Sequence, residues 1–244
     1  MAELAGIKAL NTQKNRLLIA IDGTAGAGKT TIGQMLSARL NLNYLDTGAM
    51  YRAVTLLALQ KGVSLAPPDE AGLTELARTL NFVSRNATPE EAVDQRQYTV
   101  LVDGRDVSED LRSPVVEKWV SVVAAVPRVR SELVERQREI SLNAPGGIIM
   151  MGRDIGSVVL PGADLKIYLD ASPEVRAKRR SKQSTDKTQE EARQNLEKRD
   201  RVDSQRAVAP LVVADGAVVI HTDHLTREQV MEQVEAVLAP LLVK

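Results

Sequence analysis

The feature that most constrains this chain is the stretch IAIDGTAGAGKTT, residues 19 to 31, in which an apolar run breaks into a glycine-rich loop. The loop satisfies Gly-x4-Gly-Lys-Thr, and a strand is predicted before it and a helix after it. In that setting backbone N–H groups can surround phosphate oxygens while the helix adds its positive end. We therefore expect an ATP or GTP site, with Lys29 on the β/γ-phosphates and the Thr30 hydroxyl on Mg²⁺. The residues expected to hold the triphosphate are Gly23, Thr24, Ala25, Gly26, Ala27, Gly28, Lys29, Thr30 and Thr31.

Short apolar runs rich in branched residues alternate with longer helical patterns along the chain. Such alternation predicts an α/β fold with a parallel sheet covered by helices on both faces. The predicted strands are residues 17–21, 43–45, 147–151, 165–169 and 217–220. The predicted helices follow the glycine loop and then cover 49–61, 115–142 and 226–243.

Two segments do not fit this alternation. Residues 81–113 contain strand-like runs and turn signals, which predict a small antiparallel insertion. Residues 173–206 are densely charged with a helical pattern, which by itself is typical of a solvated helix pair. We therefore expect one domain over residues 1–244, with a core made of 16–80, 114–172 and 207–244.

Composition narrows the possible partners of the chain. Lys+Arg and Asp+Glu both number 32, so no net charge favours nucleic acid or an acidic membrane surface. The 244 residues contain no cysteine, which excludes disulfides and thiolate zinc sites. The start of the chain lacks the pattern of a signal peptide, and no later run reaches membrane-spanning length. We expect a cytoplasmic protein with neither a nucleic-acid nor a membrane partner.

A second motif, YLDTGAMYR at residues 44–52, suggests a pocket for a phosphoryl acceptor. It places Asp46 and Thr47 just beyond a predicted strand, with Arg52 about one helical turn farther on. Taken singly, these residues could be a helix cap and a surface arginine. A hydrolysing NTPase needs only water, whereas a kinase needs such a second pocket.

At this point the sequence resembles the bacterial cytidylate kinases, the CMP/dCMP kinases of the nucleoside monophosphate kinase family. The resemblance covers about residues 17 to 225. It is carried by the motifs IDGTAGAGKTT, YLDTGAMYRA, VAAVPRVR, GRDIGSVVLPGADLKIYLDAS, RAKRR and RDRVDSQRAVAPL. It implies a three-layer P-loop NTPase fold with a five-stranded parallel sheet, a monophosphate-binding insertion at about 81–113 and a helical lid at about 173–206. The family usually has an acidic residue where this chain has Met151.

The resemblance also implies roles for individual residues. It places the CMP phosphate against Thr47, Arg52, Arg153 and Arg206, with Asp46 beside them. It assigns the cytosine to Ser121, Arg130 and Asp154, and the ribose hydroxyls to Arg199 and Asp203. It makes Arg176, Arg179 and Arg180 lid residues that close over the triphosphate. The catalytic residues it implies are Lys29, Arg153, Arg180 and Arg206, with Mg²⁺ held by Thr30 through ATP.

The chemistry of these residue types agrees with the roles that the resemblance implies. Arginine offers a planar fork for bidentate phosphate contacts, and converging arginines offset the charge of two bound nucleotides. Asp154 supplies an acceptor for the exocyclic amine of cytosine. If residues 199–206 are helical, Arg199, Asp203 and Arg206 share one face of that helix.

We therefore expect a monomeric enzyme that moves the γ-phosphoryl group of ATP directly onto CMP or dCMP. Three alternatives differ from it in testable ways. A kinase for UMP, AMP or a non-nucleotide such as shikimate would have no use for Ser121, Arg130 and Asp154 together. A GTPase-type switch would need an Asn-Lys-x-Asp motif, which the sequence lacks. A nucleic-acid-handling ATPase fits poorly with zero net charge and with a single Trp and a single Phe.

Overall fold

A computed structural model describes residues 16–242 of the chain, apart from residues 89, 92–97, 182–187 and 207. Within these residues no helix combines the length and the apolar character that crossing a bilayer requires. The elements in chain order are β1 (Leu17–Gly23), α1 (Lys29–Leu40), β2 (Asn43–Asp46), α2 (Thr47–Lys61), α3 (Glu70–Arg78), β3 (Phe82–Asn86), β4 (Tyr98–Val102), β5 (Arg105–Asp106), a 3₁₀ turn (Asp110–Arg112), α4 (Pro114–Ala125), α5 (Pro127–Asn143), β6 (Gly147–Met151), a π-helical turn (Ile155–Val159), β7 (Leu165–Asp170), α6 (Pro173–Ser181), α7 (Gln189–Gln205), β8 (Val218–His221) and α8 (Arg227–Leu242).

The core is a five-stranded sheet in the order β2-β6-β1-β7-β8, and every neighbouring pair is parallel. All of its strands were predicted from the sequence, each within two residues of its observed ends. Strand β6, which lies between β2 and β1 and has the sequence GIIMM, is buried along its whole length. A strand covered on both faces reads as a continuous apolar run, which explains this sequence.

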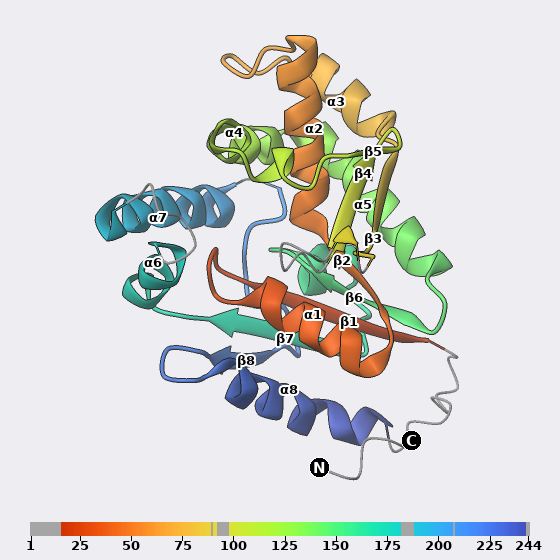
Figure 1. Ribbon diagram of the computed structural model, residues 1–244, viewed down its shortest axis with the longest axis vertical. Coiled ribbons are helices and arrows are strands. Elements are labelled where there is room, and N and C mark those ends of the chain that lie inside the picture. Colours follow the sequence, from red (N-terminus) through yellow and green to blue (C-terminus); the bar gives the residue numbers. More distant parts are fainter. Residues whose placement is uncertain (1–15, 89, 92–97, 182–187, 207, 243–244) are drawn as a thin grey trace.

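Helices cover both faces of the sheet, so the fold has the three predicted layers (Figure 1). Side chains alternate along a strand between the faces of a sheet. Ile19, Ile21 and Ile149 belong to the core that is shared with α1 and α8. Ala20 and Met150 belong to the second core, which is shared with α2, α3, α4 and α5. The carboxyl ends of β1, β2 and β6 therefore open between the two helical layers.

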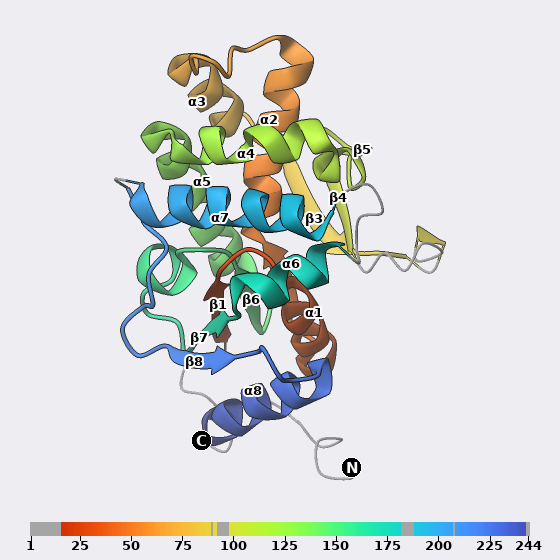
Figure 2. The same cartoon turned by 90° about the vertical axis from the view of Figure 1, so that its left-hand side faces the viewer.

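Strands β3, β4 and β5 form the predicted small antiparallel sheet, in that order. The helices α6 (Pro173–Ser181) and α7 (Gln189–Gln205) pack against each other, and α7 also packs against α4 (Figure 2). A capping box between Thr188 and Glu191 begins α7. Such a box satisfies two backbone donors at once and fixes where the helix starts.

The single helix predicted over residues 115–142 is wrong, because the structure has two helices, α4 and α5, that meet at Pro127. Proline has no backbone N–H, and it disfavours helical geometry in the residue before it. Val126 is accordingly extended, with φ −71° and ψ 117°. The break turns α5 away from α4, and Arg130 lies in the first turns of the new helix.

Candidate active site

A cleft of about 890 Å³ lies at the carboxyl ends of the core strands, and residues of α6 and α7 are among those that line it. This is the position in which open α/β sheets bind ligands. The structure brings most of the predicted site residues together there. Those that line the cleft are Ala25, Gly26, Ala27, Gly28, Lys29, Thr30, Thr31, Asp46, Thr47, Arg52, Ser121, Arg130, Arg153, Asp154, Arg179, Arg180, Arg199, Asp203 and Arg206.

Glycine is required at both ends of the loop between β1 and α1. Gly23 has φ +145°, and a Cβ there would lie 2.0 Å from the carbonyl oxygen of Leu169 in β7. Gly28 has φ +102° with open space where a Cβ would be, so only its backbone conformation demands glycine. The loop therefore presents bare backbone to the cleft at the N-terminus of α1, as an anion site requires.

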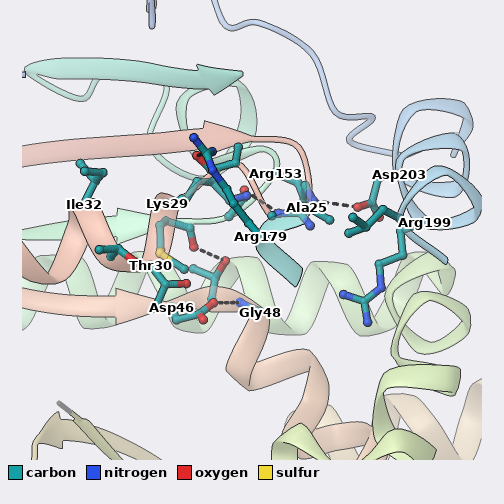
Figure 3. Close-up of a pocket in the computed structure, with 18 of the residues that line it drawn as sticks. Ala25, Lys29, Thr30, Ile32, Asp46, Gly48, Arg153, Arg179, Arg199 and Asp203 are labelled. Atoms are coloured by element: carbon teal, nitrogen blue, oxygen red, sulfur yellow. Dashed lines mark hydrogen bonds and ion pairs between the residues drawn. The ribbon is translucent and has the colours of Figure 1, made fainter. Parts of the chain in front are cut away.

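Lys29 extends along this loop and is buried within it (Figure 3). Its Nζ donates to the carbonyl oxygens of Gly23, at 2.8 Å, and Thr24, at 2.7 Å. Burial, and after it the nearby Arg153, lowers the pKa of Lys29 well below its usual value. An anionic phosphate at this position would favour the charged ammonium again.

The residues around Lys29 suit a triphosphate that carries Mg²⁺. Thr30 stands in the first turn of α1, and Asp46 caps α2 by accepting from the Gly48 N–H at 3.0 Å. Both present oxygen atoms, the ligand type that Mg²⁺ prefers. Thr47 lies between the two predicted subsites, and its hydroxyl donates to the Met151 carbonyl oxygen at 2.9 Å.

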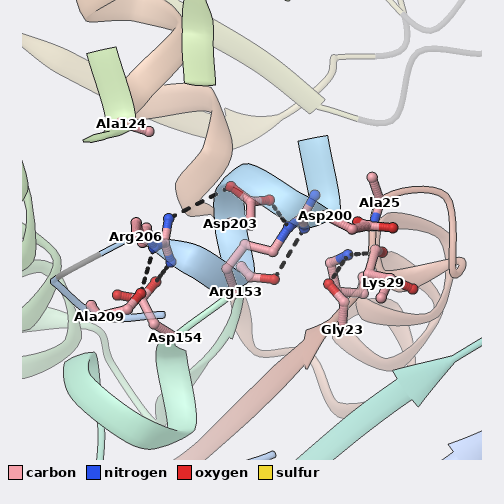
Figure 4. Close-up of polar contacts among 12 residues, drawn as sticks. Gly23, Ala25, Lys29, Ala124, Arg153, Asp154, Asp200, Asp203, Arg206 and Ala209 are labelled. Atoms are coloured by element: carbon pink, nitrogen blue, oxygen red, sulfur yellow. Dashed lines mark hydrogen bonds and ion pairs between the residues drawn. The ribbon is translucent and has the colours of Figure 1, made fainter. Parts of the chain in front are cut away.

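The opposite end of the cleft is held by pairs of arginines and carboxylates (Figure 4). Arg130 and Asp154 form a buried ion pair with side chains 3% and 7% exposed. Arg206 lies 3.6 Å from Asp154 and 3.7 Å from Asp203. The Arg153 Nε donates to Asp203 at 2.8 Å. A continuous polar network therefore links β6, α5 and the end of α7.

These pairs determine the charge states of their members. Burial would raise the pKa of Asp203, but Arg153 and Arg206 outweigh it and leave that pKa below the usual value. Burial, followed by repulsion from Arg52, lowers the pKa of Arg199 to about 10. Arg199 is therefore charged at neutral pH although other cations crowd it. Such a group of confined cations is a good site for anions.

Arg199 and Asp203 share a face of α7, as predicted, but Arg206 does not extend that face. The helix ends at Gln205, and Arg206 is extended, with φ −64° and ψ 141°. Its Nε donates to the Ala209 carbonyl oxygen at 2.5 Å. Arg206 therefore reaches the cleft from the segment that leaves the helix.

Gly23, Thr24 and Arg176 are the predicted site residues that do not line the cleft. Arg176 is 4% exposed, and its guanidinium donates to Ala25 O at 3.1 Å and to Asp200 at 2.5 Å. Asp200 in turn accepts from the Ala25 N–H at 3.1 Å. The pair thus fastens both α6 and α7 to the phosphate loop, and a contact of Arg176 with the triphosphate stays a prediction.

Sequence reasoning missed two residues that organise the cleft. The Tyr51 ring lies 5.3 Å from the Arg130 guanidinium carbon, and burial raises its pKa to about 12. The Asp22 carboxylate accepts from the N–H groups of Ile155, at 2.8 Å, and Gly156, at 2.7 Å. Both signals were in the quoted motifs: Tyr51 is one helical turn from Thr47, and Asp22 comes near the end of β1.

Comparison with known proteins agrees with this geometry. Residues 19–239 match the model of a protein family described as Cytidylate kinase. The chain belongs to the cytidylate kinase family. A cytidylate kinase of Pelotomaculum thermopropionicum is 46% identical over 222 residues, which cover 89% of this chain and 94% of that protein.

Relatives of a second kind are longer. A bifunctional pantoate ligase/cytidylate kinase of Synechococcus sp. strain JA-2-3B'a(2-13) is 45% identical over 231 residues. The match covers 93% of this chain but only 41% of that relative's length. Among solved structures, an uncharacterized protein from Eubacterium ventriosum matches with a TM-score of 0.50 at 10% identity, over 92% of this chain and 99% of the other. That last likeness concerns the fold alone.

This member of the cytidylate kinase family has Met151 directly before the Gly-Arg-Asp motif. Its side chain is 3% exposed and accepts a hydrogen bond from the Tyr44 hydroxyl at 2.9 Å. Met151 therefore ends β6 with its side chain against β2, and it brings no charge to the cleft. The carboxylates that line the cleft among the described residues are Asp46, Asp154, Asp203 and Glu228.

Proposed function

We propose that this chain transfers the γ-phosphoryl group of ATP to CMP or dCMP, which yields ADP and CDP or dCDP. One observation carries the proposal: a single cleft has a phosphate loop at one end and the buried Arg130–Asp154 pair at the other. The first end suits a triphosphate, and the second suits a polar base. Membership of the cytidylate kinase family supports the same reading.

The donor half would bind the triphosphate mainly through backbone N–H groups and the Lys29 ammonium group. Loop N–H groups and the N-terminus of α1 would hold the phosphates, and Lys29 would turn from its carbonyl partners toward the transferred group. Mg²⁺, bound with ATP next to Thr30, would neutralise phosphate charge. Arg179 and Arg180 of α6 would cover the triphosphate from the lid side.

The acceptor half would recognise each part of CMP separately. Asp154 would accept from the cytosine amine, with Arg130 and Ser121 on the same base. Arg199 and Asp203 would contact the ribose. Cleft residues that would hold the acceptor phosphate, in line with the donor, are Thr47, Arg52, Arg153 and Arg206.

Transfer would be direct, without a phosphoenzyme, and would depend on positioning and charge stabilisation more than on a general base. The helices α6 and α7 would exclude water from the closed cleft and so limit hydrolysis of ATP. We assign residues 81–113 to the monophosphate-binding insertion and 173–206 to the lid of one kinase domain. We further propose a cytoplasmic monomer whose partners are its small-molecule substrates.

A coupled assay of ADP release tests this function. ATP and Mg²⁺ are supplied with CMP, dCMP, UMP, AMP or shikimate, one acceptor at a time. We expect CMP and dCMP to give the highest kcat/KM by a wide margin. Equal or faster release with another acceptor would contradict the assignment of Asp154 and Arg130 to the base, and release that needs no acceptor would indicate an ATPase.

A further inference from the structure

Glu117 on α4 lies among the lid arginines, and neither the motifs nor the proposed mechanism gives it a role. One of its carboxylate oxygens accepts from Arg180 of α6. The other lies 3.8 Å from the Arg199 guanidinium of α7. The Glu117 side chain is 14% exposed, and α4 packs directly against α7 (Figure 2). A single carboxylate on the acceptor side of the cleft therefore contacts both lid helices.

The position of Glu117 on its helix points it toward the cleft. Ser121, one turn farther along α4, lines the cleft, and residues four apart lie on the same helical face. Arg180 and Arg199 line the cleft as well. The contacts of Glu117 thus hold these two guanidinium groups at the site where nucleotide phosphates and sugar are proposed to bind.

Electrostatics explains why a carboxylate is useful at this point. After burial, repulsion from Arg52, Arg153 and Arg180 lowers the pKa of Arg199, and Glu117 is the carboxylate that opposes this effect. Burial would raise the pKa of Glu117 itself, but Arg180 and then Arg199 outweigh it and leave that pKa below its usual value. Glu117 is therefore ionised at neutral pH and offsets part of the repulsion among the arginines.

A carboxylate and a phosphate bind arginine through the same charge-assisted hydrogen bonds. We propose that Glu117 is a positioning residue that holds Arg180 and Arg199 over the cleft before nucleotides bind, and then releases them to the nucleotides. This inference rests on the proposed function of the cleft. In the free protein Glu117 would hold Arg180 and Arg199 close together in spite of their repulsion. When substrate binds, Glu117 would compete with it for the same two arginines.

Thermodynamic linkage between the Glu117 contacts and nucleotide binding predicts the direction in which Kd changes when Glu117 is replaced. A contact that stabilises the free protein more than the complex weakens ligand binding, so removing the contact strengthens it. For Glu117→Gln we expect the Kd of CMP and of a non-hydrolysable ATP analogue to fall about two- to fivefold, the range expected for partly exposed ion pairs. Weaker binding would overturn the proposal, because it would mean that Glu117 keeps its arginines in the complex.

Hydrogen exchange reports on the lid itself. Without nucleotide, the amides of α6 and α7 should exchange faster in Glu117→Gln than in the unchanged protein. With saturating CMP and ATP analogue, the difference should vanish. Equal exchange without nucleotide would show that Glu117 does not hold the lid. A difference that persists in the complex would show a purely structural role, which also contradicts the proposal.

Two further variants control these measurements. Glu135→Gln removes the same charge from an exposed position on α5, outside the cleft, and should change neither Kd nor lid exchange. Glu117→Asp keeps the charge on a shorter side chain and should restore part of the lid protection. An effect of Glu135→Gln equal to that of Glu117→Gln would assign the result to net charge and refute a specific contact.

The same experiment separates this inference from the proposed function. CMP turnover by the unchanged protein is measured in parallel. If CMP were not phosphorylated but the ATP analogue alone removed the exchange difference, the function would fail and the role of Glu117 would stand. If CMP were phosphorylated while both Kd and exchange were insensitive to Glu117→Gln, only the role of Glu117 would fail.

Discussion

The two halves of the cleft are built in different ways. The donor half is built mainly on one continuous stretch, residues 25–31, which runs from the loop after β1 into the first turn of α1. The acceptor half collects Asp154 from the end of β6, Arg130 from α5, Ser121 from α4 and Asp203 from α7. The donor half offers backbone groups fixed by glycine geometry, whereas the acceptor half offers side chains that are fixed by one another.

This difference predicts where single substitutions should be most damaging. In the donor half most phosphate contacts are expected from backbone N–H groups, which remain when a side chain is removed. Lys29 is therefore the residue of this loop at which a substitution should cost most. In the acceptor half Arg130, Arg153, Asp154, Asp203 and Arg206 each lie beside a partner of opposite charge. Removing one partner leaves the other buried and unpaired, so effects there should spread over several residues and be strongly non-additive.

The largest effect is expected at Lys29. Lys29→Ala should lower kcat by about 10³-fold or more with saturating ATP, because it removes a preorganised cation from the transferred phosphoryl group. The melting temperature should change little, since the main partners of Lys29 in the free protein are two loop carbonyls. Lys61→Ala, at the exposed end of α2, is the control and should be neutral. A kcat within a few-fold of the unchanged protein would contradict the donor assignment.

The second prediction concerns base choice at Asp154. A carboxylate accepts from the cytosine amine but repels the uracil carbonyl oxygen at the same position, so we expect a CMP-over-UMP preference of about 10²–10³ in kcat/KM. Asp154→Asn should erode this preference, with activity on CMP falling more than activity on UMP. Its amide can donate to uracil, while Arg130 loses its buried ionic partner.

Kinetics with CMP and UMP on both proteins check this prediction. Asp215→Asn, an exposed change outside the cleft, serves as the matched control. An unchanged preference in Asp154→Asn would remove Asp154 from base recognition and would leave Arg130 and Ser121 as the readers.

The third prediction tests the helical face of the lid. Arg199→Ala and Asp203→Ala should each lower kcat/KM for CMP by about 10- to 100-fold, the range expected when charge-assisted hydrogen bonds are lost. Lys198→Ala and Arg201→Ala, on the exposed side of α7, should be nearly neutral. Steady-state kinetics on the four variants decide between the two outcomes. Equal losses in all of them would mean that α7 acts through bulk charge.

The smallest effect should appear in acid. The pKa of Asp203 lies below its usual value of 3.8 in the folded protein, so its stabilising contribution is present above about pH 4 and is lost as the pH falls through the folded value. Asp203→Asn should therefore lower the melting temperature at pH 7 but much less at pH 2.5. A difference between the two proteins that stayed constant across this range would mean that Arg153 does not perturb the carboxylate.

The same contrast explains what the sequence could predict. The donor loop and the core strands were predictable because each is a local pattern of glycines, charges or apolar residues within a few positions. The break before Pro127 was also visible in the sequence, but the apolar periodicity on both sides concealed it. The network of Asp200, Arg176 and Ala25 was not predictable, because its members meet only after the lid packs on the loop.

Glu117 shows most clearly what could not be predicted from the sequence. In the sequence it is one acidic residue within an amphipathic helix, and its meaning depends on two arginines more than sixty residues away. The motif that contains Tyr51 indicates which face of its helix meets the cleft, but its partner Arg130 is distant in the sequence and could not be predicted. Residues whose partners are distant in sequence can be assigned by resemblance or by structure, but not by spacing.

The hydrogen bonds that Asp22 accepts help to fix the relative position of the two proposed substrate sites. Asp22 immediately precedes the phosphate loop, and its carboxylate accepts from the backbone N–H groups two and three residues beyond Arg153. Strands β1 and β6 are neighbours, about 4.8 Å apart as in any sheet. The groups proposed to bind donor and acceptor are thus both attached to neighbouring strands of one rigid sheet. The proposed motion of α6 and α7 would then open and close the cleft without altering that alignment, to which in-line transfer is most sensitive.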